Sequence, residues 1–154
     1  MMKDPFHEAK VALNGAKRAF MEVNSLSVMD AYATNQACEN SVRTIWQIAT
    51  GEPFPHDQFK PFHRPASYIR RIGLEKYYSN RSKVFLAKLD GYALDEARYE
   101  NTQAYKDHTK PTAGYRGSEL IKGTERFIEE TEQLATKEEV LQTIQDFHRL
   151  DCTP

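Results

Sequence analysis

The spacing of apolar residues in the first third of the chain constrains the fold more than any other feature of the sequence. Apolar side chains recur at alternating intervals of three and four residues at Phe6, Ala9, Leu13, Ala16, Phe20 and Val23, and the same spacing continues from Ala31 to Ala49. This spacing is typical of the buried stripe of an amphipathic helix. Asp4 can cap the first helix and Gly51 can end the second. A short polar turn at 24–27 separates them, so we expect an antiparallel helical hairpin.

The rest of the chain also favours helices. Four prolines within 52–65 leave room only for short helical turns. Further helices are predicted at 66–76 with an interruption at Gly73, at 81–89, at 115–134 and at 137–149, the last opened by a capping box at Thr136–Glu139. Residues 91–117 show no sustained period, although a short helix at 94–99 fits the sequence. No alternating strand pattern occurs, so we predict one all-α domain over 1–154.

Charge is distributed unevenly along a chain whose formal net charge is −1. Residues 56–88 carry 8 Lys and Arg against 2 Asp and Glu, whereas residues 89–154 carry 8 against 14. Such a division is typical either of a surface for polyanions or of a self-complementary interface. The alternative is a basic helix packed on an acidic one within the domain. No membrane span or signal peptide is apparent and cysteines are few, so we expect a cytoplasmic protein.

Three short motifs occur together with this helical pattern. They are Trp46–Glu52 at the end of the hairpin, His56–Asp57 after it, and Asp95–Tyr99 before the helix at 115–134. In these motifs the chain resembles the HEPN superfamily of small helical bundles. The resemblance covers residues 5–135 and leaves 136–150 as an additional C-terminal helix. It implies an up-and-down bundle of four to five helices, which is frequently a homodimer and in some members is paired with a nucleotidyltransferase-type partner protein.

The resemblance also bears on activity. RNase members of the superfamily carry an Arg followed, a few residues later, by a His. No histidine here has an Arg at that spacing, and the closest pairs are Arg98 with His108 and Arg43 with His56. The resemblance therefore implies a non-catalytic nucleotide- or RNA-binding protein, of the kind that can form one half of a toxin–antitoxin or defence pair.

Candidate phosphate contacts come from two places. The segment 60–88 interleaves cations with aromatic residues, a composition typical of single-strand nucleic-acid surfaces, and includes Arg70 and Arg71. The alternative is a solvated helical face whose aromatic residues belong to the core. The resemblance adds Arg98 and Tyr99 from its loop motif, joined by Arg116. Arg98 can instead pair with an acid of the following helix while Tyr99 closes the end of the bundle.

The histidines offer a second interpretation. His56 or His108 can serve as the general base of a divergent metal-independent RNase, with an Arg stabilising the phosphate in the transition state. His56, Asp57 and His63 could also ligate a metal, but Pro61 separates the two histidines, and the simpler interpretation is that Asp57 caps a short helix. We therefore predict no metal and no cofactor. A third hypothesis is a helical interaction module without any ligand.

Two polar residues fall within the predicted stripe of the second helix. Cys38 is interpreted as a small core residue, because no His or Asn near it suggests a nucleophile. Asn35 needs a hydrogen-bonding partner, which a second subunit could supply.

Overall fold

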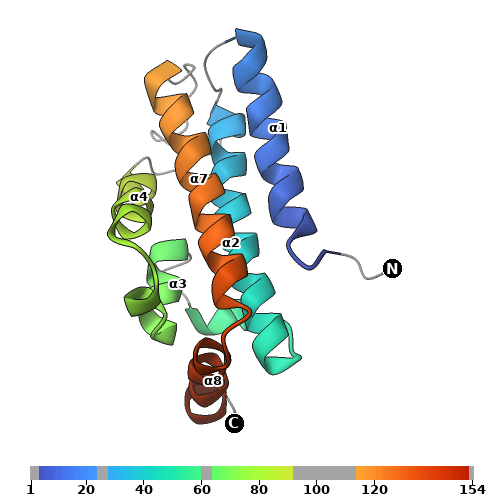
Figure 1. The fold of residues 1–154 in the computed structure, drawn as a ribbon, viewed down its shortest axis with the longest axis vertical. Coiled ribbons are helices and arrows are strands. Elements are labelled where there is room, and N and C mark those ends of the chain that lie inside the picture. Colours follow the sequence, from blue (N-terminus) through green and yellow to red (C-terminus); the bar gives the residue numbers. More distant parts are fainter. Residues whose placement is uncertain (1–3, 24–27, 60–63, 92–113, 153–154) are drawn as a thin grey trace.

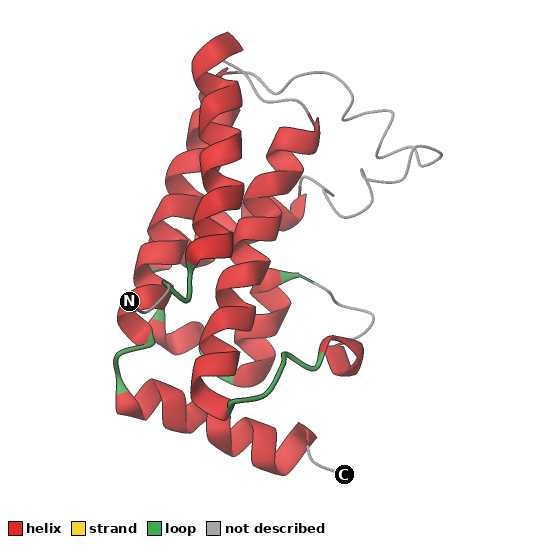
Figure 2. Ribbon diagram, turned by 90° about the vertical axis from the view of Figure 1, so that its right-hand side faces the viewer, coloured by secondary structure: helices red, strands yellow, loops and turns green. Residues whose placement is uncertain are grey.

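The computed structural model describes residues 4–23, 28–59, 64–91 and 114–152, and these ranges are helical apart from short connections (Figures 1 and 2). Within them the chain forms six α-helices and no strand, which confirms the predicted all-α helical bundle. The helices are α1 (His7–Val23), α2 (Val28–Thr50), α3 (Pro65–Ile72), α4 (Asn80–Gly91), α7 (Gly114–Leu134) and α8 (Glu138–Phe147). Most of the segment 91–117, including the short helix expected at 94–99, lies outside the described residues.

Helices α1 and α2 run antiparallel and side by side, as the apolar spacing predicts (Figure 1). Asp4 caps α1, because its Oδ1 accepts the N–H of Phe6 at 2.9 Å. The apolar stripe of α1 is buried from Phe6 to Ala16, and that of α2 is buried as far as Ala49. Gly51 then ends α2 with a φ of 73°, a left-handed conformation that glycine adopts without strain.

Helix α7 lies along the hairpin and completes the main core (Figure 1). Cys38 is fully buried at the α2–α7 contact, where its Sγ lies 4.0 Å from the Thr124 hydroxyl. Burial raises the pKa of this thiol to about 12, so Cys38 is a core residue, as predicted. Asn35 finds its partner within α2, since its side-chain amide donates to Glu39 Oε1 at 3.2 Å.

Helices α3 and α4 form the side of the bundle next to α2 and α7. α3 ends earlier than predicted, at Gly73, where φ is 92° and the backbone turns into a 3-10 turn at Glu75–Tyr77. Tyr78 then stacks on Phe127 of α7 with ring centroids 4.9 Å apart, and its hydroxyl lies 2.8 Å from that of Thr131. These contacts hold the start of α4 against α7.

Helix α8 crosses the lower end of the bundle (Figure 2). Its Phe147 lies edge-on to the fully buried Trp46 of α2, with ring centroids 6.0 Å apart. Phe54 and His148 approach the same indole at 5.5 Å and 5.3 Å. The chain continues as a π-helical turn at His148–Cys152. An aromatic cluster thus joins the ends of α2 and α8.

The predicted capping box at the start of α8 is wrong. The Thr136 hydroxyl donates to the carbonyl of Gln133 at 2.7 Å, so it completes the last turn of α7. Lys137 occupies the N-cap position of α8 and forms no side-chain cap. The short connection leaves the free carbonyls of α7 within reach of Thr136, and these carbonyls compete for the hydroxyl.

Candidate functional site

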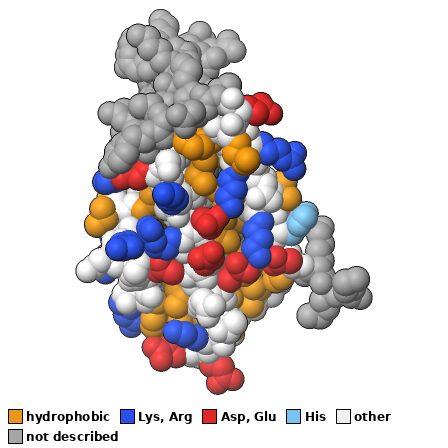
Figure 3. Space-filling view, turned by 45° about the horizontal axis from the view of Figure 1, so that its top comes forward, with side chains coloured by type: hydrophobic (Ala, Val, Ile, Leu, Met, Phe, Trp, Pro, Cys, Tyr) orange, Lys and Arg blue, Asp and Glu red, His pale blue; other side chains and the backbone are white. Residues whose placement is uncertain are grey.

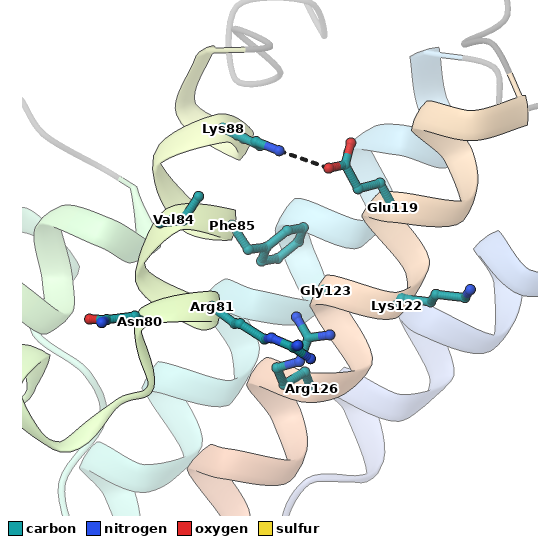
Figure 4. A pocket seen from close by; sticks show the side chains of 9 residues that line it. All are labelled: Asn80, Arg81, Val84, Phe85, Lys88, Glu119, Lys122, Gly123 and Arg126. Carbon is teal, nitrogen blue, oxygen red and sulfur yellow. Dashed lines mark hydrogen bonds and ion pairs between the residues drawn. The ribbon is translucent and has the colours of Figure 1, made fainter.

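A groove lies between α4 and α7, and its volume is about 420 Å³ (Figure 4). We call it the α4–α7 groove. It is lined by Asn80, Arg81, Val84, Phe85 and Lys88 of α4 and by Glu119, Lys122, Gly123 and Arg126 of α7. The lining therefore contains four cationic side chains and a single carboxylate. The residues recur at helical spacing on both helices, which brings each set onto one face.

The centre of the groove is apolar because α4 and α7 approach closely there. The ring of Phe85 packs on Gly123, and a Cβ atom at position 123 would overlap with that ring. Phe85 is buried by this contact, whereas Val84 beside it is 56% exposed. Gly123 thus leaves room for the Phe85 ring at the bottom of the groove, between the charged residues of α4 and those of α7.

One end of the groove is closed by an ion pair. Lys88 Nζ of α4 lies 2.8 Å from Glu119 Oε1 of α7, and Figure 4 shows the two side chains reaching toward each other across the groove. The pair compensates the charge of Lys88 and of the only carboxylate in the lining.

The other end carries two arginines from different helices. Arg81 and Arg126 both line the groove, and Figure 4 shows their guanidinium groups converging. Neither forms a hydrogen bond or an ion pair with any residue that the structure describes, and the same holds for Lys122. This end therefore has cationic donors that the fold itself does not use.

Glu130, a carboxylate on which the charge of Arg126 acts, is hydrogen-bonded to the start of α4. Glu130 accepts the backbone N–H and the hydroxyl of Ser79, each at 2.8 Å, and the hydroxyl of Ser82. Burial acts to raise the pKa of Glu130, but these hydrogen bonds and the charge of Arg126 outweigh burial and hold the pKa below its usual value. Glu130 caps α4 and does not line the groove.

The arginines that the sequence singled out on α3 are not part of this groove. Arg70 Nε lies 3.2 Å from Glu75 Oε2. Arg71 donates to the carbonyl of Gln58, and its guanidinium carbon lies 4.8 Å from the centre of the Phe59 ring. Both arginines have partners within their own part of the chain.

The other predicted site residues lie at the edge of the described chain or beyond it. Arg98, Tyr99 and His108 lie outside the described residues. Arg116 falls in the first turn of α7, and its side chain lies outside the described part of the structure.

The sequence indicated only half of the groove. Arg81 and Lys88 belong to the basic segment 60–88. Lys122 and Arg126 lie in the last third of the chain, whose net negative charge gave no indication of a cationic site. Glu119, Gly123 and Arg126 follow one another at helical intervals. This spacing places the three residues on one face of α7, and together with the position of α4 it identifies the α7 side of the groove.

A second cavity of about 480 Å³ brings together an arginine and a histidine that are far apart in the sequence. Arg43 Nη2 of α2 lies 3.4 Å from His56 Nδ1, in the 3-10 turn His56–Phe59. Because a guanidinium only donates, His56 must accept through Nδ1 in this contact. Glu8, Asn40, Thr44, Gln47, Pro53 and Phe54 complete the lining. We call this space the Arg43–His56 cavity.

The metal site that the sequence allowed for this segment is described only in part. Asp57 is the second residue of the 3-10 turn and lies in its first turn. The turn starts at His56 because the N–H of Gln58 bonds to the carbonyl of Pro55 at 3.0 Å. His63 lies outside the described residues, and among those described no three His, Cys, Asp or Glu side chains are grouped as metal ligands.

The uneven charge is partly compensated within the fold. Acids of α7 pair with lysines of α1, since Glu132 lies 2.9 Å from Lys10 and Glu125 pairs with Lys17. On the face shown in Figure 3, basic and acidic side chains are intermixed. The two segments of opposite charge meet where α4 packs on α7, and there Lys88 of the basic segment pairs with Glu119 of the acidic last third.

Comparison with known proteins gives no match for this chain. No protein-family model, no curated protein and no solved structure matches it. Within the described ranges, no helix is both long and apolar enough to span a bilayer.

Proposed function

We propose that the α4–α7 groove binds the phosphate of a nucleotide or of single-stranded RNA, and that the protein acts there as a binding protein and not as a catalyst. The observation that carries this proposal is the convergence of Arg81 and Arg126 without any acidic partner in the groove lining. Guanidinium groups donate in pairs to phosphate oxygens, and two of them from separate helices can hold one phosphate from two sides.

The surroundings of the two arginines support a ligand in preference to simple solvation. Lys10, Lys17 and Lys88 each lie within ion-pair distance of an acid. At this end of the groove like charges face each other instead, an arrangement that costs free energy until an anion binds. Val84 adds an exposed apolar surface beside the cations, which suits a base or a ribose.

The proposal is compatible with the non-catalytic binding that the HEPN resemblance implies. The resemblance, the homodimer and the nucleotidyltransferase-type partner stay predictions.

Fluorescence anisotropy tests the proposal directly. A short labelled RNA is titrated with wild-type protein and with the double variant Arg81→Gln/Arg126→Gln, at low and at physiological salt, without metal. The matched control is Arg18→Gln, which removes one cation from an exposed position on α1. We expect salt-dependent binding, and a log–log salt slope that falls by about 0.7 for each phosphate that the double variant no longer neutralises. Equal affinity of the double variant and wild type, or no binding at low salt, would contradict the proposal.

The Arg43–His56 cavity supports a second candidate function, a metal-independent RNase. The proximity of Arg43 and His56 favours it, because the two residue types needed for the chemistry meet there. When a phosphate binds Arg43, His56 would accept the proton of the attacking 2′-hydroxyl, while the guanidinium compensates the charge that develops on the phosphorus oxygens.

A denaturing gel tests this second candidate. Labelled RNA is incubated without metal with wild type, His56→Ala and Arg43→Gln, and with Asn14→Ala as a control on the exposed face of α1. Cleavage by wild type and the control, and its loss in the other two variants, is the expected result. Intact RNA with wild type, or undiminished cleavage by His56→Ala, excludes this candidate.

A further inference from the structure

We infer that the Arg81–Arg126 end of the groove recognises a terminal phosphate monoester, carried by a mononucleotide or by the end of an RNA strand, in preference to the internal phosphodiesters of RNA. This inference rests on the proposed function, and it specifies which kind of phosphate the site binds.

The charge at this end of the groove matches a monoester. Arg81 and Arg126 bring two positive charges there, and no carboxylate of the lining lies at that end. A phosphate monoester carries a charge of about −1.5 to −2 at neutral pH, whereas an internal diester carries a single negative charge. A monoester therefore compensates both guanidinium groups, and a diester leaves one of them uncompensated.

The carboxylate of Glu130 does not occupy the position proposed for the phosphate. Glu130 is the carboxylate that influences Arg126, but three donors from Ser79 and Ser82 hold it at the start of α4. The hydrogen bonds orient its oxygens toward α4 and leave Arg126 available to the groove. Glu130 thus holds the start of α4, the helix that carries Arg81, and does not bind in the groove itself.

The shape of the groove favours a chain end over a continuous strand. Lys88 and Glu119 close the end opposite to the arginines. The volume of about 420 Å³ is in the range of pockets that hold one small molecule. A terminal nucleotide can place its phosphate between the arginines and its apolar face over Val84 and Phe85. A continuous strand that follows the long direction of the groove would meet the Lys88–Glu119 pair.

The experiment compares RNAs of one sequence with an internal fluorophore. One RNA carries a 5′-phosphate, another a 3′-phosphate, and a third has hydroxyl groups at both ends. Adenosine 5′-monophosphate, adenosine and inorganic phosphate serve as competitors, so that a free nucleotide can be distinguished from an RNA end and from phosphate alone. Wild type, Arg81→Gln, Arg126→Gln, the double variant and the control Arg18→Gln are measured at one fixed salt concentration.

The expected result is binding about tenfold tighter for a phosphorylated end than for hydroxyl ends, as the loss of charge-assisted hydrogen bonds predicts. This preference should disappear in the double variant and persist in Arg18→Gln. Adenosine 5′-monophosphate should compete better than adenosine. If all three RNAs bind equally and the double variant weakens them equally, the inference is overturned while the proposed function stands. If none binds wild type and the mononucleotide does not bind either, both are overturned.

Thermal unfolding of each variant accompanies these titrations. Arg81 is exposed and has no hydrogen bond or ion pair in the described structure, so Arg81→Gln should unfold at the temperature of wild type. The charge of Arg126 acts on Glu130, so Arg126→Gln should unfold at or slightly below that temperature. An unchanged midpoint together with the disappearance of the preference for phosphorylated ends assigns the effect to the groove. Disappearance of the preference only in variants that unfold earlier counts against the inference.

Discussion

Two pairs of arginines in this protein have similar side chains but opposite surroundings. On α3, Arg70 pairs with Glu75, and Arg71 bonds to Gln58 and covers Phe59. In the α4–α7 groove, Arg81 and Arg126 converge without a hydrogen bond or ion pair to any described residue. The first pair contributes to the fold and the second is available to a ligand. The number of cations in a segment is therefore a weaker guide to a binding site than the interactions in which those cations are already engaged.

The largest difference between the two pairs should appear in binding. Replacing Arg81 and Arg126 by Gln is expected to weaken RNA or nucleotide binding about a hundredfold, which corresponds to about 2.7 kcal/mol. Replacing Arg70 and Arg71 by Gln should leave the affinity within about threefold, because phosphate contacts there would first have to break existing interactions. Anisotropy titrations at one salt concentration measure both. An equal loss of affinity in the two double variants would remove the distinction between the pairs.

A second difference should appear in stability and in the opposite direction. Arg71→Ala is expected to lower the free energy of unfolding by about 1 kcal/mol, because it removes a hydrogen bond and a cation–π contact. Arg81→Ala should leave the stability unchanged. Urea unfolding measures the free energy of unfolding of both variants. A larger loss of stability in Arg81→Ala than in Arg71→Ala would contradict this prediction.

Glycine substitutions test how the floor of the groove is built. Gly123→Ala is expected to destabilise the protein by about 1 kcal/mol or more, since the new methyl group must displace the ring of Phe85. Gly15 on α1 has no heavy atom near the position of a Cβ, so Gly15→Ala should instead stabilise by about 0.5–1 kcal/mol through helix propensity. Thermal unfolding distinguishes the two signs. A stabilised Gly123→Ala would show that α4 and α7 can separate at little cost, and the groove would then not be rigid.

The cap of α4 by Glu130 should make stability depend on pH. The folded state lowers the pKa of Glu130, so the carboxylate stabilises the fold above its usual pKa of 4.5, and this contribution is lost as the pH falls through the lowered value. Urea unfolding from neutral to acidic pH should show Glu130→Gln less stable than wild type at neutral pH, with the difference shrinking in acid.

The matched control is the exposed neighbour Glu129→Gln. Its unfolding free energy should follow that of wild type across the same range of pH. A difference between wild type and Glu130→Gln that stays constant in acid would contradict the assigned role of the carboxylate.

The smallest expected effect concerns the ion pair that closes the groove. Glu119→Gln should lower the free energy of unfolding by less than about 1 kcal/mol, because Lys88 and Glu119 are both partly exposed. The same change removes a negative charge from the groove lining and should tighten phosphate binding about twofold at low salt. Chemical unfolding and anisotropy measure the two effects, and weaker binding by Glu119→Gln would assign the carboxylate a direct role with the ligand.

Local patterns were sufficient to predict most of the helices. The spacing of apolar residues indicated the hairpin, and Asp4 and Gly51 mark its ends because capping depends on residues adjacent in sequence. Thr136 shows the limit of this reasoning. Its sequence fits a capping box, but the carbonyl of Gln133 in the preceding helix takes the hydroxyl.

The groove could not be predicted in the same way, because its two sides come from helices separated by a long segment. Arg126 stands among acids in the sequence, and only the packing of α4 on α7 brings it into the same groove as Arg81. Gly123 has no local signature either, because its role depends on the ring of Phe85 across the contact. The pairing of Arg70 with Glu75 was likewise not apparent from the sequence, since it follows from the turn after Gly73.

The burial of Trp46 gives the protein an optical reporter. It is the only tryptophan in the chain, and it lies among aromatic rings where α2 meets α8. Its emission in the native protein should be at short wavelength and should shift to longer wavelength when water reaches the indole. Because α4 and the upper part of α7 lie away from this junction in Figure 1, a ligand or substitution in the groove that leaves the tryptophan spectrum unchanged acts locally, and one that shifts the spectrum has loosened the whole bundle.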